Sequence, residues 1–265
     1  MRIRCLGSAL MLMSGGSALA ETYEIDSLSR AFETGTVSVL EVTEAMLLRI
    51  QERDGELRAF VTVNPNARAM ARARDTFHDD GVFRGPLDGI PIAVKDNIET
   101  SDPMPTTAGS LALADNLTRR DADVVAKLRG VGAVIIGKAN LSEWANFRSR
   151  HSSSGWSATG GQTRNPYDLT RSPCGSSSGS AVAVAAGMAV AAIGTETDGS
   201  IVCPAAMNGL VGFKPALGEL SVVGVVPIAP SQDTPGPITH SVIDALLFTE
   251  AMGGEKSATA GASAA

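Results

Sequence analysis

The stretch RSPCGSSSGSAVAVAAG, residues 171–187, decides the fold because it joins a loop of serine and glycine to a helix of small residues. The apolar run VAAIGT, residues 190–195, follows and is typical of a buried strand. The same alternation occurs earlier, where the strand IPIAV (residues 90–94) is followed by the helix DADVVAKLRGVG (121–132) and the strand AVIIG (133–137). This pattern predicts an α/β protein with a sheet covered by helices.

Three amphipathic segments precede the first of these strands. They are IDSLSRAFETG (residues 25–35), VSVLEVTEAMLLRIQERDG (37–55) and NPNARAMARARDTFHDDG (64–81), and each ends near a glycine. Apolar residues at helical spacing before a glycine predict three N-terminal helices.

The two ends of the chain have a different character. Residues 1–20 combine a basic start, a short apolar run and small residues, with Ala18 and Ala20 preceding Glu21. This is typical of a signal peptide, so we expect a periplasmic or secreted protein; the alternative is a buried N-terminal helix. The apolar run is too short to span a bilayer, so no membrane association is expected after cleavage. Residues 253–265 are low-complexity and predict a disordered tail.

Composition narrows the function further. A chain of 265 residues with a net charge of −6 fits one or two globular domains and shows no basic footprint for nucleic acid. Of its three cysteines, Cys5 lies in the signal segment. Cys174 and Cys203 could pair in an oxidising compartment, but two small, partly buried thiols are the favoured interpretation. No cysteine or histidine cluster suggests a metal.

Two common catalytic patterns are imperfect here. Gly132, Gly137 and Lys138 have the spacing of a phosphate loop, but a strand separates the glycines and Ala139 replaces the hydroxyl residue. Residues 175–179, GSSSG, match a nucleophile elbow centred on Ser177, with His240 and Asp233 as the available partners. The residues before this segment are polar and turn-forming, whereas an elbow follows a hydrophobic strand.

A second serine-bearing segment offers better chemistry. In AAIGTETDGSIVCPAAM, residues 191–207, a strand leads into a turn, and a proline-started helix follows Ser200. The backbone amides near Thr197, Asp198 and Gly199 could bind a developing oxyanion. No histidine lies near Ser200, but Lys95 at the end of an apolar strand could act as the base if burial lowers its pKa.

Three segments in this order resemble the amidase signature family: GIPIAVKDNIE (residues 89–99), SPCGSSSGSAVAVAAG (172–187) and GTETDGSIVCPAAMNGLVGFKP (194–215). Shorter matches at residues 106–113, 137–146 and 231–246 extend the resemblance over about residues 22–252. The second and third segments most resemble bacterial peptide amidases. The resemblance implies an amidase signature domain over residues 21–252, with a mixed central sheet between two helical layers.

The resemblance also assigns roles. Lys95 matches the base, Ser176 a bridging serine that follows a cis peptide bond, and Ser200 the nucleophile. Thr197, Asp198 and Gly199 match the oxyanion hole, and Ser177 matches a serine that supports the lysine. We therefore expect a Ser-Ser-Lys relay that hydrolyses small-molecule or peptide amides through an acyl-enzyme and needs no metal or organic cofactor.

Two departures from the family leave alternatives open. Cys174 stands where many members carry glycine, and members are roughly twice as long, so the fold is expected to be incomplete at its C-terminus. A catalytically inactive, truncated fragment that binds a partner is therefore one alternative. The A-type subunit of a tRNA-dependent amidotransferase is the other, and the signal peptide argues against it. The oligomeric state and the preferred acyl group are left open.

Overall fold

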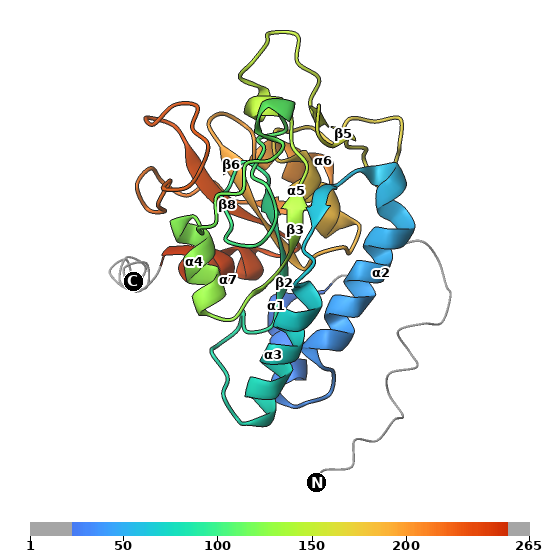
Figure 1. The fold of residues 1–265 in the computed structure, drawn as a ribbon, viewed down its shortest axis with the longest axis vertical. Coiled ribbons are helices and arrows are strands. Elements are labelled where there is room, and N and C mark those ends of the chain that lie inside the picture. The colour runs from blue at the N-terminus through green and yellow to red at the C-terminus, as the bar shows by residue number, and fades with distance from the viewer. Residues whose placement is uncertain (1–22, 254–265) are drawn as a thin grey trace.

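The computed structural model describes residues 23–253, so the predicted signal peptide lies outside the described residues. The predicted tail lies outside them too, except for Gly253, which ends the last helix. Figure 1 shows the elements in order. The helices are α1 (Ile25–Glu33), α2 (Val39–Leu57), α3 (Ala67–Asp79), α4 (Asp123–Gly130), α5 (Ser178–Ala185), α6 (Val202–Met207) and α7 (Val242–Gly253). The strands are β1 (Phe60–Val63), β2 (Pro91–Lys95), β3 (Val134–Ala139), β4 (Trp156–Ser157), β5 (Gly161–Gln162), β6 (Ala191–Glu196), β7 (Val211–Gly212) and β8 (Thr234–Thr239). Two short 3₁₀ helices occupy Leu111–Leu113 and Glu143–Asn146.

The central sheet is mixed, with the strand order β1-β3-β2-β6-β8-β7. The three middle strands β3, β2 and β6 are parallel, and β1, β8 and β7 pair in antiparallel fashion. A separate hairpin pairs β4 with β5. No helix among residues 23–253 is long and apolar enough to cross a bilayer.

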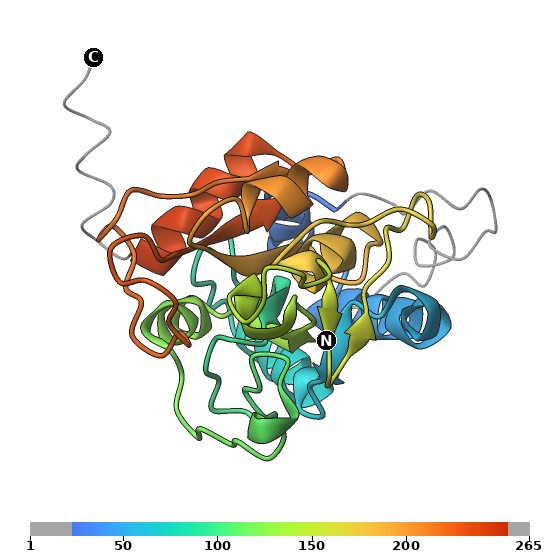
Figure 2. The same ribbon diagram turned by 90° about the horizontal axis from the view of Figure 1, so that it is seen from above.

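Helices cover both faces of the sheet. The crossover from β2 through α4 leads to β3, and the crossover from β3 through α5 leads back past β2 to β6. Because such crossovers are right-handed, the two directions place α4 and α5 on opposite faces. In Figures 1 and 2, α4 lies beside α7 and α3 lies along α2, and these pairs are in contact. The predicted three-layer α/β architecture is confirmed.

The small residues of the stretch 171–187 allow helix α5 to pack closely against the sheet. All eight of its residues are buried, and it packs against β2, β3, β6 and β8. A Cβ atom added at Gly179 would lie 2.5 Å from the backbone nitrogen of Asn140, at the end of β3. Only glycine therefore fits where this helix crosses the sheet, and the close approach brings the serines before it into the interior.

The structure corrects one expectation and adds elements. Helix α6 begins at Val202, two residues before Pro204, instead of at the proline. The segment Thr234–Thr239 forms β8 within the sheet although it contains Pro235 and Pro237, which disfavour an interior strand. Strands β1 and β7 and helix α7 were also not predicted from the sequence.

Candidate active site

Lys95 is the last residue of β2 and is completely buried. Its Nζ donates hydrogen bonds to Ser176 Oγ at 2.7 Å, to Thr195 Oγ1 at 2.8 Å and to the Thr195 carbonyl at 3.1 Å. An ammonium group has three donors, and here each donor has an acceptor. The side chain is thus fixed against the serine loop and the end of β6.

Burial lowers the pKa of Lys95 to about 7, because an ammonium group without water is destabilised. The negative charges of Glu196 and Asp233 oppose this shift without cancelling it. Near neutral pH a large fraction of Lys95 is therefore a neutral amine, which can accept a proton from a hydroxyl group.

Of the two serines before α5, Ser176 contacts Lys95 and Ser177 contacts Thr195. The peptide bond between Gly175 and Ser176 is cis, as the resemblance implied. Ser177 Oγ donates to the Thr195 carbonyl and accepts from the Thr195 amide, both at 3.2 Å. Ser177 therefore holds the same residue that Lys95 contacts.

Ser200 ends the turn between β6 and α6. Its residue is 8% exposed, and its carbonyl accepts a hydrogen bond of 3.1 Å from the Ser177 amide. This bond ties the two serine-bearing segments together. Within residues 23–253, no hydrogen bond joins the hydroxyls of Ser176 and Ser200, so the second link of the expected relay stays a prediction.

The turn itself comprises Thr197, Asp198 and Gly199. Gly199 has a φ of +76°, a conformation that favours glycine, and a Cβ added there would meet open space. Among the described residues, the amides of Asp198 and Gly199 have no hydrogen-bond acceptor. Free donors beside Ser200 are what an oxyanion hole requires.

Glu196 connects the start of this turn to the first residues of α6. Its Oε2 accepts hydrogen bonds from the amides of Ile201 at 2.7 Å and Val202 at 3.0 Å, at the start of α6. A buried carboxylate at this position satisfies two amides that a helix start leaves unpaired. Sequence reasoning missed Glu196, although it lies inside the nucleophile segment.

Two residues distant in sequence also hold the turn. Thr197 Oγ1 donates to Asp233 Oδ1 at 2.5 Å, and Lys214 Nζ donates to the Thr197 carbonyl at 2.7 Å. Both residues lie in matched segments, but nothing in those segments indicates their contacts. Thr195 was missed as well, and its hydroxyl also accepts from Asn97 at 3.0 Å.

A small pocket opens beside Thr195 and Thr197. Its wall combines five apolar side chains with the polar groups of Asn97 and Asp233; the apolar ones are Ala145, Val222, Val225, Val226 and Ile228. The pocket has a volume of about 10 Å³, which is room for about one water molecule.

The structure excludes the two weaker patterns. His240 Nε2 lies 3.2 Å from the Val184 carbonyl, and Asp233 binds Thr197, so neither residue contacts Ser177 as an elbow would require. Lys138 lies in β3, is completely buried, and donates to the Ile98 carbonyl at 2.8 Å, so it forms no phosphate loop. Within residues 23–253, no group of histidine, cysteine and acidic residues is arranged to hold a metal ion.

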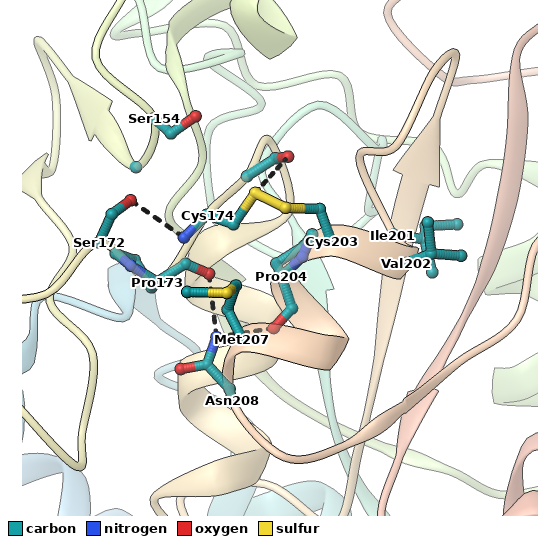
Figure 3. Close-up of a disulfide and its surroundings, with 12 residues drawn as sticks. Ser154, Ser172, Pro173, Cys174, Ile201, Val202, Cys203, Pro204, Met207 and Asn208 are labelled. Carbon is teal, nitrogen blue, oxygen red and sulfur yellow. Dashed lines mark hydrogen bonds between the residues drawn. A yellow bond between two sulfur atoms is a disulfide. The ribbon is translucent and has the colours of Figure 1, made fainter.

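Cys174 and Cys203 form a disulfide, with Cα atoms 5.9 Å apart (Figure 3). The favoured expectation of two unpaired thiols was therefore wrong. The sequence could not decide the question, because the cysteines meet only when the serine loop packs against α6.

Comparison with known proteins agrees with this geometry. The amidase family matches residues 41–264. Peptide amidase from Stenotrophomonas maltophilia is 52% identical, with a TM-score of 0.85 over 91% of this chain and 50% of that chain. A peptide amidase in complex with the competitive inhibitor chymostatin is 53% identical, with the same TM-score and coverage.

A third relative belongs to another branch. The A subunit of the glutamyl-tRNA(Gln) amidotransferase of Thermobifida fusca is 47% identical over 228 residues, which are 86% of this chain and 45% of that subunit. The chain thus spans about half the length of the relatives it matches. With its family segments assembled around one buried lysine, the chain belongs to the amidase family.

Proposed function

We propose that this chain carries the catalytic residues of a serine amidase that hydrolyses carboxamides, with C-terminal peptide amides as the preferred class. The observation that carries the proposal is the buried Lys95, whose pKa is lowered to about 7 and whose Nζ lies 2.7 Å from Ser176 Oγ. A neutral amine at this place is a base for the serine hydroxyl.

In the proposed reaction, neutral Lys95 takes the proton of Ser176 while Ser176 takes the proton of Ser200. Ser200 Oγ then attacks the amide carbonyl, and the amides of the turn from Thr197 to Gly199 receive the negative charge on the oxygen. The relay returns the proton to the leaving nitrogen, which departs as ammonia because the amide anion is a poor leaving group. Water hydrolyses the acyl-enzyme by the reverse path. The residues named need no metal or organic cofactor for these steps.

The substrate class is supported by the relatives. Two similar solved structures are peptide amidases, one of them with the inhibitor chymostatin. We propose a periplasmic or secreted location, because the disulfide between Cys174 and Cys203 is typical of oxidising compartments.

The test is ammonia release from a panel of peptide amides by the purified chain, beside Lys95→Ala and Ser200→Ala variants. We expect release that each variant lowers by about 10²-fold or more. No release from a folded chain would contradict the proposal and favour the inactive, partner-binding fragment.

A second function, the A-type subunit of an amidotransferase, is favoured by the 47% identity to such a subunit. Free glutamine in the same panel separates the two functions. Release from glutamine, without release from peptide amides, would favour the amidotransferase subunit.

A further inference from the structure

The disulfide joins the two segments that carry the proposed serines. Cys174 comes just before the cis bond that leads to Ser176, and Cys203 lies in α6, three residues after Ser200. A bond between these positions restricts how far the serine loop and the nucleophile turn can separate. The disulfide therefore limits the distance between Ser176 and Ser200, the two side chains of the proposed proton transfer.

Apolar packing of Ala181 against Ile201 and Ala205, together with hydrogen bonds, also connects the same segments. The Ser177 amide donates to the Ser200 carbonyl at 3.1 Å. Asn208 Nδ2, at the end of α6, donates to the Pro173 carbonyl at 3.0 Å (Figure 3). Each of these bonds can be exchanged for a bond to water when the segments move apart, whereas the disulfide cannot.

The backbone at Cys174 gives a second indication. Its φ is +59°, in the left-handed region that glycine adopts freely and other residues adopt at a conformational cost. A cysteine here is therefore less favourable than glycine for the loop itself. The disulfide to Cys203 offsets the conformational cost of cysteine at this position.

We propose that the Cys174–Cys203 disulfide is a positioning element that holds Ser200 against Ser176, so that its reduction lowers turnover. This rests on the proposed amidase function. Reduction by a dithiol transfers two electrons and two protons, which converts the disulfide to two thiols and the dithiol to its own disulfide. Both sulfurs belong to partly exposed residues, which a dithiol can reach.

The test compares the oxidised chain with the chain reduced by dithiothreitol, each carrying Cys5→Ala to remove the remaining thiol. Two double variants serve as controls: Cys174→Ser with Cys203→Ser, and Cys174→Gly with Cys203→Ser. Glycine suits the left-handed backbone, so the second control separates the tether from the shape of the loop. Ammonia release gives kcat and KM, and thermal melting reports whether each sample is folded.

We expect reduction to lower kcat by about tenfold or more, with KM changed by less than about twofold, because small displacements of reacting groups act on the chemical step. Oxidation should restore the reduced chain, and both double variants should stay slow and insensitive to dithiothreitol. An unchanged kcat after complete reduction would overturn the proposal. So would full activity of the glycine variant.

Amide hydrogen exchange tests the tether without turnover. Reduction should speed exchange in residues 172–180 and 199–208 and leave β2 and β3 unchanged. If the oxidised chain releases no ammonia, the amidase proposal fails, and faster exchange in these two segments alone would still support the tether. Unchanged exchange there would refute it whatever the activity.

Discussion

Replacing Lys95 with methionine should make the protein inactive and more stable at the same time. A shift of the Lys95 pKa from 10.5 to about 7 corresponds to about 5 kcal/mol of unfavourable free energy for burying the charged form. Methionine has a similar length and no charge, so it removes this cost. It also leaves the hydroxyls of Ser176 and Thr195 without the lysine, at about 1 to 3 kcal/mol. The net gain at pH 6 is therefore about 2 to 4 kcal/mol.

The gain should depend on pH in a defined way. Below pH 7 residue 95 of the wild type is charged in both the folded and the unfolded chain, and the full cost of burial is present. Between pH 7 and 10.5 the unfolded chain holds a proton that the folded chain has lost, so the wild type gains stability as the pH rises. The advantage of Lys95→Met should fall by about 1.4 kcal/mol per pH unit in this window and change sign before its upper end, at about pH 8.5 to 10.

Lys138→Met is the matched control. Lys138 is the second completely buried lysine, and burial lowers its pKa as well. Its Nζ lies 3.4 Å from Asp96 Oδ1, and Asp96 is also fully buried. Removing the lysine leaves that carboxylate without its countercharge, which costs about 3 to 5 kcal/mol. We expect the two methionine variants to change stability in opposite directions at pH 6.

Urea unfolding followed by circular dichroism, with the disulfide intact, measures both differences at pH 6, 8.5 and 10. Ammonia release measures the loss of activity on the same samples. A Lys95→Met variant less stable than the wild type at pH 6 would refute the reasoning. A difference independent of pH would refute it too, because it would mean that Lys95 titrates alike in both states.

Three further outcomes are expected. The kcat of the wild type should rise with pH to a plateau with a midpoint near 7, where Lys95 becomes neutral; a flat profile between pH 5.5 and 8.5 would contradict a lysine base. Ser200→Ala should abolish ammonia release while Ser177→Ala lowers it only in part, since Ser177 contacts Thr195; equal losses would favour another nucleophile. Gly179→Ala should lower the free energy of unfolding by about 1 to 3 kcal/mol in thermal or urea melts, because its Cβ would collide with backbone at the end of β3; a variant as stable as the wild type would show that α5 can shift.

Much of the fold follows from local patterns. The apolar run before Lys95 forms β2, and the small residues after Ser177 form α5. Strand β8 could not be predicted in this way, because Pro235 and Pro237 disfavour a strand when judged by propensity alone. Strand β8 lies beside β6 because the two strands pair in antiparallel fashion, with Ala192 opposite Ile238. This pairing outweighs the low strand propensity of the two prolines.

The candidate site shows the same division. The family resemblance selected Lys95, Ser176 and Ser200 from the sequence. The structure joins Lys95 Nζ to Ser176 Oγ, and it joins the Ser200 carbonyl to the Ser177 amide. The family resemblance could not select Glu196 or Asp233. Acidic residues are common, and only the contacts of these two with the turn distinguish them. The pairing of Cys174 with Cys203 was equally out of reach, since 29 residues separate the two cysteines.

The sequence by itself determined the strands β2, β3 and β6, the helices α1 to α5, and which residue types are available for amide chemistry. These features depend on the periodicity of apolar residues and on backbone freedom, and both are set by residues close together in the sequence. The tertiary structure alone decided that Lys95 meets Thr195, because β2 lies parallel to β6 with Val94 opposite Ile193. The tertiary structure also decided that the pKa of Lys95 is lowered to about 7. Its burial depends on the segments that pack around the amine, and these are distant in the sequence.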